Sequence, residues 1–230
     1  MEDNIITNNF FKNNLFKRSI STLFLMPIFI YILLSGYHGR LYLFLIILIL
    51  IHLEWYKINS QNSNSRAILY WSGWIYITLP FIYWISSSYN KLWPYNLSFF
   101  VIVWTCDIFA YIGGKLIGGK KFVPSISPNK TWSGVVCGII FAEIFGQCCY
   151  YYFGKSMFNL LPDSLFNRTL FILVIAIGTV LGDLLESKIK RKLQIKDSGN
   201  LIPGHGGILD RFDGFLGATW LLLIAEYFNS

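Results

Sequence analysis

Long runs of apolar residues constrain this chain more than any other feature of its sequence. A helix needs roughly 17–25 predominantly apolar residues to cross the hydrocarbon layer of a bilayer. Such runs span about residues 20–36, 41–57, 67–87, 95–113, 133–153, 167–187 and 208–228. Because lipid offers the backbone no hydrogen-bond partners, each run must satisfy its own polar groups as an α-helix. The sequence therefore predicts an all-α polytopic membrane protein with about seven transmembrane helices.

The composition agrees with a membrane protein. Only 13% of the residues are charged, whereas an average soluble domain carries about a quarter. A formal charge of +7 would suggest nucleic acid as a partner on a soluble surface, but none is expected for a chain of membrane spans. The cysteines Cys106, Cys137, Cys148 and Cys149 lie inside apolar runs without a CxxC pair, so neither a disulfide framework nor a zinc site is indicated.

The Lys and Arg residues are unevenly divided between the predicted loops. Of the 19, only Arg40, Lys91, Lys155 and Arg168 fall on the side opposite the amino terminus, and Arg211 lies within the seventh run. Because cytoplasmic loops carry the excess of Lys and Arg, the amino terminus is predicted to be cytoplasmic and the carboxyl terminus external. No targeting peptide is evident, which favours a bacterial inner (plasma) membrane.

Four aspartates lie inside the predicted spans, where ionisable residues are costly and usually functional. Asp107 and Asp183 lie late in the fourth and sixth runs, and Asp210 and Asp213 lie early in the seventh. Since successive spans alternate in direction, all four fall near the cytoplasmic ends of their helices. Carboxylates that converge at one depth repel one another, and a hard cation such as Mg²⁺ would relieve the repulsion. The alternative is simple ion pairing, of Asp210 with Arg191 and Asp213 with Lys190.

A basic and glycine-rich segment joins the sixth and seventh runs. The basic stretch KIKRKLQIK could simply lie on anionic lipid headgroups, but that does not explain the PGHGG and DRFD that follow. Gly204, Gly206 and Gly207 allow a close backbone approach, and the helix start beyond them favours an anion. Together these features indicate a polyphosphate site, although His205 is equally well explained as part of a turn. The candidate cations are Lys130, Lys190, Arg191, Lys196, His205 and Arg211.

One nucleotide-binding motif is excluded. The segment GKLIGGKK, residues 114–121, nearly fits a P-loop, but Lys121 stands where Ser or Thr should bind Mg²⁺. A predicted membrane helix rather than a β-strand also precedes it. The segment could still supply glycines and lysines to a phosphate.

Two polar blocks resemble a known family. SKIKRKLQIKDSGNLIPGHGGILDRFD, residues 187–213, resembles the signature of phosphatidate cytidylyltransferases, also called CDP-diacylglycerol synthases. DIFAYIGGKLIGGKKFVPSISPNKTWSG, residues 107–134, is similar to the family's other polar segment, with its Ser-Pro-x-Lys-Thr motif. KRSISTLFLMPIFI at 17–30 and LEWYK at 53–57 resemble the family's first helix and the end of its second. The chain departs from the family at Ser133, where many members carry Glu, and in being shorter between Trp55 and Tyr70.

The resemblance implies transfer of CMP from CTP to phosphatidate, giving CDP-diacylglycerol and pyrophosphate. It divides the chain into a cytoplasmic polar tail (1–19), a scaffold of membrane helices (20–94) and a catalytic membrane region (95–230). The implied cofactor is Mg²⁺, with a second cation left open. The implied partners are CTP, phosphatidate and membrane lipids, with a homodimer left open.

The expected site residues fall into three groups. The catalytic candidates are Asp183, Lys190, Arg191, Lys196, Asp197, Asp210, Arg211 and Asp213. The substrate-binding candidates are Ser187, Gly204, His205, Gly206, Gly207, Lys130, Ser127 and Thr131. The candidate metal ligands are Asp183 and Asp210, assisted by Asp213 and Asp107.

Other functions remain open at this level. A polyprenol or phytol kinase, or a synthase acting on ether-linked lipid, would also use CTP at a membrane. An ion-coupled transporter would place its charges at the bilayer midplane and line a pore with polar residues, whereas this chain gathers its charges at one membrane face. A non-catalytic lipid-binding scaffold would not need the combination of PGHGG and DRFD.

Overall fold

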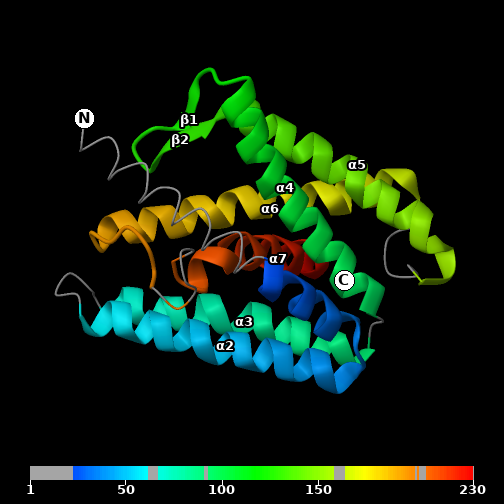
Figure 1. Cartoon of the computed structure of the whole chain (residues 1–230), viewed down its shortest axis with the longest axis horizontal. Coiled ribbons are helices and arrows are strands. Elements are labelled where there is room, and N and C mark those ends of the chain that lie inside the picture. The colour runs from blue at the N-terminus through cyan, green and yellow to red at the C-terminus, as the bar shows by residue number, and fades with distance from the viewer. Residues whose placement is uncertain are drawn as a thin grey trace.

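The computed structural model describes residues 23–61, 67–90, 93–157, 164–199, 201 and 206–229. Within them the chain forms helices and one β-hairpin, and each of the seven predicted runs coincides with a helix (Figure 1). The elements are the helix Leu23–Leu34, α2 (Tyr37–Ser60), α3 (Ala67–Asn90), α4 (Trp93–Leu116), β1 (Lys121–Val123), β2 (Ser127–Thr131), α5 (Trp132–Met157), α6 (Leu165–Lys192) and α7 (Leu209–Asn229). The predicted cytoplasmic tail, residues 1–19, lies outside the described residues.

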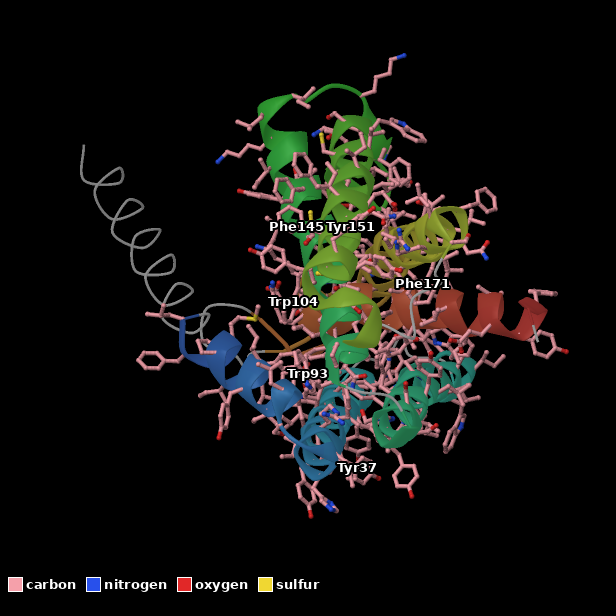
Figure 2. All side chains as sticks on the ribbon, turned by 90° about the vertical axis from the view of Figure 1, so that its right-hand side faces the viewer. Tyr37, Trp93, Trp104, Phe145, Tyr151 and Phe171 are labelled. Atoms are coloured by element: carbon pink, nitrogen blue, oxygen red, sulfur yellow. The ribbon has the colours of Figure 1, made fainter. Side chains whose placement is uncertain are left out.

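Five of the described helices, α2 to α6, are long and apolar enough to cross a membrane. The helix Leu23–Leu34 is shorter, and α7 begins with the charged residues Asp210, Arg211 and Asp213 and is not among the five. Large apolar side chains such as Phe145 and Tyr151 of α5 lie exposed on the outside of the bundle (Figure 2). The protein is therefore a helical integral membrane protein, while the count of seven spans and their orientation stay predictions.

Helices that follow one another in the chain pack as pairs, and α7 joins its own pair to the other two. The pairs α2–α3, α4–α5 and α6–α7 make the most extensive contacts, and α7 also contacts α2, α3 and α4 (Figure 1). Phe215 of α7 is fully buried at the centre, where its ring stacks on that of Phe100 of α4 at 5.3 Å between centroids. Phe44 of α2 and Phe81 of α3 pack on the same ring. This aromatic core joins the helices of the expected scaffold to the carboxyl-terminal region.

Glycines allow α6 and α7 to approach backbone to backbone. A Cβ atom on Gly182 of α6 would collide with the backbone oxygen of Asp213, and one on Gly217 of α7 would collide with that of Gly178. Small residues at helix interfaces are the usual means of close packing in membranes. Because Gly182 precedes Asp183, this contact brings Asp183 to the level of Asp213.

The link between the first two helices differs from the prediction. Residues 37–40 fall between the first two predicted runs and were therefore not assigned to a span, but α2 already begins at Tyr37. The Arg40 side chain is buried and donates hydrogen bonds to the backbone oxygens of Ser35, at 2.6 Å, and Ser88, at 3.2 Å. A cation at the carboxyl ends of helices compensates their exposed carbonyl groups, which explains why Arg40 is inside the bundle instead of at a loop surface.

A β-hairpin between α4 and α5 was not predicted. Its strands β1 and β2 pair antiparallel, with Lys121 opposite Thr131. Positive φ angles at Gly118 and Gly119 turn the chain out of α4, a conformation that glycine adopts without strain. Ser133, the residue at which the chain departs from the family pattern, donates from its hydroxyl to the backbone oxygen of Gly118 and so closes this turn.

Candidate functional site

An ion pair joins the basic end of α6 to the start of α7. Lys190 Nζ lies 2.8 Å from Asp210 Oδ1 and 3.2 Å from Glu186 Oε2. All three side chains are largely buried. Asp210 is therefore ion-paired, but both predicted pairings are wrong over the described residues. The partner of Asp210 is Lys190 and not Arg191, and Lys190 contacts Asp210 and Glu186 and not Asp213.

Asp210 also holds the loop that precedes α7. Its Oδ2 accepts hydrogen bonds from the backbone N–H groups of Ser198 and Gly207, both at 2.9 Å, and its Oδ1 is 3.2 Å from the Ser198 nitrogen. Gly206 has a φ of 86°, which lets the backbone turn its amide groups towards this carboxylate. Both oxygens of Asp210 are thus engaged by protein groups, which leaves this carboxylate less open to a metal than its position in the sequence suggested.

The start of α7 is occupied by a carboxylate from a distant helix. Glu54 of α2 accepts from the backbone N–H of Ile208 through Oε1 and of Leu209 through Oε2, both at 2.9 Å. The Asp210 amide in turn donates to the hydroxyl of Ser198 at 3.3 Å. The expectation that this helix start binds a phosphate is contradicted by these contacts, because the amide groups of residues 207–210 already have protein partners.

Sequence reasoning missed Glu54. It was quoted only within LEWYK, as part of a family resemblance. The available signal was a carboxylate inside the predicted span 41–57, where an ionisable residue indicates a role. The partners of Glu54 lie more than 140 positions away in sequence, so no local pattern pointed to them.

Three of the four predicted metal ligands converge from separate helices. Asp107 of α4 reaches α7, where its Oδ2 lies 3.2 Å from the position that a Cβ atom on Gly214 would take. The carboxylates of Asp107, Asp183 and Asp213 interact electrostatically. The close packing of α6 on α7 and the contact of α4 with both helices place them at one level.

Glu186 adds a further carboxylate that the sequence analysis did not single out. Its Oε1 is buried without a hydrogen-bond partner, and its charge interacts with that of Asp213. Among the described residues, no three His, Cys, Asp or Glu side chains are already arranged to hold a metal ion. Over the described ranges the acidic groups thus lie near one another without a ready-made set of three metal ligands.

The β-hairpin contributes Lys130 to this acidic cluster. Lys130 Nζ forms an ion pair with Asp183 Oδ2, while Asp183 Oδ1 accepts from the hydroxyl of Ser187 at 3.3 Å. The ion pair ties β2 to the carboxyl-terminal half of α6. Thr131 instead caps α5, because its hydroxyl accepts from the Gly134 amide at 3.2 Å.

The remaining predicted site residues are exposed, half-buried or outside the described residues. Ser127 is half-buried at the start of β2. Gly204 and His205 fall outside the described residues. Arg191, Lys196, Asp197 and Arg211 are exposed, and the charge of Arg211 interacts with that of Asp107.

An apolar pocket of about 380 Å³ adjoins the polar groups. It lies between α3 and α6, which both pack near α7 but, over the described ranges, do not pack on each other. Trp55, Tyr76 and Leu185 contribute to its largely apolar wall, and Lys190 and Asp213 lie at its polar side. The site thus combines charged groups with an apolar space that opens between two membrane helices.

Comparison with known proteins is consistent with the resemblance of the polar blocks. The cytidylyltransferase family model matches residues 89–228. A phosphatidate cytidylyltransferase of Rickettsia bellii is 38% identical over 213 residues, which cover 89% of this chain and 87% of that protein. One of Rickettsia conorii is 34% identical over 223 residues, covering 94% and 93%. One of Bacillus subtilis is 41% identical over 149 residues, covering 62% and 51%. The chain belongs to the cytidylyltransferase family.

Proposed function

We propose that this protein transfers CMP from CTP to phosphatidate, giving CDP-diacylglycerol and pyrophosphate in phospholipid biosynthesis. Relatives that match most of the chain carry the name of this activity. The observation that carries the proposal is the apolar pocket between α3 and α6, which runs up to Lys190 and Asp213. A water-soluble nucleotide and a lipid headgroup can meet only where charged groups border a space accessible from the bilayer.

The reaction suits a site without a strong general base. A phosphate oxygen of phosphatidate is already anionic, and it attacks the α-phosphorus of CTP. The new oxygen–phosphorus bond forms as the bond from the α-phosphorus to the bridging oxygen breaks, and pyrophosphate leaves with the electron pair. The site must therefore align two mutually repelling phosphates and stabilise the charge of the leaving group.

The cationic side chains around the cluster would bind the phosphates. Lys130 and Lys190 are held at its centre by ion pairs. Arg191, Lys196 and Arg211 are exposed on the adjoining segments, where they can meet a nucleotide from the aqueous side. Charge-assisted hydrogen bonds from such groups are about twice as strong as neutral ones.

The acidic cluster fits Mg²⁺, a cation that prefers carboxylate oxygens. The fit rests on the convergence of Asp107, Asp183 and Asp213 and on the orphaned Oε1 of Glu186. Asp183 and Asp213 are the leading candidate ligands. Asp183 would have to give up its ion pair with Lys130, and Asp210 its hydrogen bonds from two backbone amides. When bound, Mg²⁺ neutralises phosphate charge and orients the reacting groups.

The pocket would receive an acyl chain of the lipid substrate. Its wall is largely apolar, and Lys188 and Lys192 lie along the α6 side, where they can contact lipid headgroups. We further propose seven spans, a cytoplasmic amino terminus and a site facing the cytoplasm of a bacterial inner membrane. The uneven distribution of Lys and Arg supports this orientation.

Product analysis tests the proposal against the lipid-kinase alternative. Purified protein is supplied with CTP and either phosphatidate or a polyprenol, and both soluble products are measured. The proposal expects pyrophosphate, formed only with phosphatidate. Release of CDP with the polyprenol would establish the kinase instead.

A further inference from the structure

Glu54 of α2 is a buried carboxylate that binds the start of another helix. Glu54 is only 4% exposed. Its two oxygens accept from the amides of Ile208 and Leu209, at 2.9 Å each, and Oε2 also accepts from the Ser198 hydroxyl at 3.3 Å. No described Lys, Arg or His side chain forms an ion pair with Glu54. The positive end of α7 therefore supplies the stabilisation that a cation would give.

Two glycines show how closely the backbone surrounds this carboxylate. A Cβ atom on Gly199 would lie 2.7 Å from Glu54 Oε1, and one on Gly207 would lie 2.6 Å from Oε2. Side chains at these positions would push the loop away from Glu54. Gly199 and Gly207 thus leave room for the Glu54 carboxylate. This carboxylate lies at the helix start where the sequence predicted a phosphate.

The contacts of Glu54 lead directly to the candidate site. Ser198, which donates its hydroxyl to Glu54, donates its backbone N–H to Asp210 at 2.9 Å. Gly207, next to the amides that Glu54 binds, also donates to Asp210 at 2.9 Å. Asp210 then holds Lys190 at 2.8 Å. A displacement of the backbone at Ser198 or at Gly207 would therefore move Asp210 and, with it, the ion pair to Lys190.

We propose that Glu54 is a positioning residue for cytidylyl transfer, holding Ser198 next to the start of α7 so that Asp210 can orient Lys190. This inference rests on the proposed function, and it assigns a role in the site to a helix outside the segment matched by the family model. Glu54 acts through the backbone and through Asp210, so it lowers the barrier without touching a substrate. Its loss should reduce kcat more than it raises KM for CTP.

The test compares Glu54→Gln with a matched variant, Glu143→Gln. Glu143 of α5 also accepts side-chain hydrogen bonds inside the bundle, from Gln147 at 2.7 Å and Thr169 at 2.9 Å. Both variants replace a hydrogen-bonded carboxylate by an amide of the same size. Amide hydrogen exchange of the segment 206–210 is measured together with kcat and KM for CTP.

For Glu54→Gln we expect exchange in 206–210 to accelerate about tenfold or more, because two amides lose a charged acceptor. We expect kcat to fall by about tenfold or more, the change produced by a barrier higher by about 1.4 kcal/mol, with KM for CTP within about threefold of the wild type. Glu143→Gln should leave both readouts unchanged. Glu54→Asp, which keeps the charge on a shorter side chain, should recover part of kcat.

Wild-type exchange and wild-type kcat in Glu54→Gln would overturn the inference, as would equal losses in both variants. If Glu54→Gln does not fold, Ser198→Ala removes one contact of the same carboxylate and should show the same two changes in smaller measure; unchanged values there would also overturn it. If the wild type transfers no CMP, the proposed function fails, whereas the exchange measurement still decides whether Glu54 holds the loop.

Discussion

Lys190 of α6 and Asp210 of α7 form a buried ion pair, 2.8 Å from Nζ to Oδ1, that joins the basic end of one helix to the start of the next. The residues are 20 positions apart in the chain. Asp210 uses its second oxygen to hold the backbone at Ser198 and Gly207. The pair therefore connects the glycine loop, the two helices and the acidic cluster in one network.

This pairing predicts a strong effect of Asp210→Asn. Removing one member of a buried pair leaves the other charge uncompensated, which costs about 3–5 kcal/mol. We expect the melting temperature in detergent to fall and CMP transfer to drop by about 100-fold or more. Lys190→Met in the same background should restore only part of the stability and none of the activity, since it removes the uncompensated lysine but also takes away the cation that pairs with Glu186. Additive losses of stability in a double-mutant cycle would contradict the pairing.

A second prediction concerns Lys130 and the β-hairpin. Its ion pair with Asp183 is partly exposed, with 23% and 31% of the two side chains accessible, so it should add at most about 1 kcal/mol to stability. Lys130→Met should therefore keep the wild-type melting temperature while CMP transfer falls by about tenfold or more. Lys121→Met, an exposed lysine of the same hairpin, is the control and should retain activity. Equal activity in the two variants would remove Lys130 from the site.

The glycine contact between α6 and α7 gives a third prediction. A Cβ atom on Gly217 would collide with the backbone at Gly178 and Gly182, so Gly217→Ala must separate the helices. Overpacking of this kind costs about 1–3 kcal/mol and would move Asp213 away from Asp183. We expect a lower melting temperature together with reduced activity. Gly36→Ala, where a Cβ atom meets nothing within 4 Å, should change the melting temperature less than Gly217→Ala does.

The pocket between α3 and α6 gives a fourth prediction. Ser72 lines it from α3, and Ser72→Trp should fill part of its volume of about 380 Å³. If the pocket receives an acyl chain, KM for phosphatidate should rise several-fold, while KM for CTP stays unchanged. Ser86→Trp places the same side chain at an exposed position farther along α3 and should alter neither constant. A rise in KM for CTP alone would show that the pocket is not the lipid site.

The sequence predicted the helices well because apolar runs carry their own signal. Each predicted run coincides with a helix, since a membrane helix satisfies its backbone within one segment. The β-hairpin at 121–131 was missed because its short strands carry no apolar alternation. Arg40 was placed in a loop because its carbonyl partners, at Ser35 and Ser88, follow from helix packing that no local pattern encodes.

The sequence predicted which residues lie in the candidate site better than it predicted which of them contact one another. The convergence of Asp107, Asp183 and Asp213 followed from helix direction and depth. The choice of Lys190 instead of Arg191 as the partner of Asp210 depends on how α6 is rotated against α7, which the sequence does not specify. Glu54 could not be assigned because its partners are backbone amides in a distant segment.

The most direct test measures where the α-phosphate and the γ-phosphate of CTP go during the reaction. Purified protein in phosphatidate-containing vesicles with Mg²⁺ receives CTP labelled with ³²P at either the α- or the γ-phosphate. Cytidylyl transfer predicts that α-label enters the lipid fraction and that γ-label leaves as pyrophosphate, with neither reaction in the absence of phosphatidate. Transfer of γ-label to lipid, or no transfer of α-label by folded protein, would contradict the account.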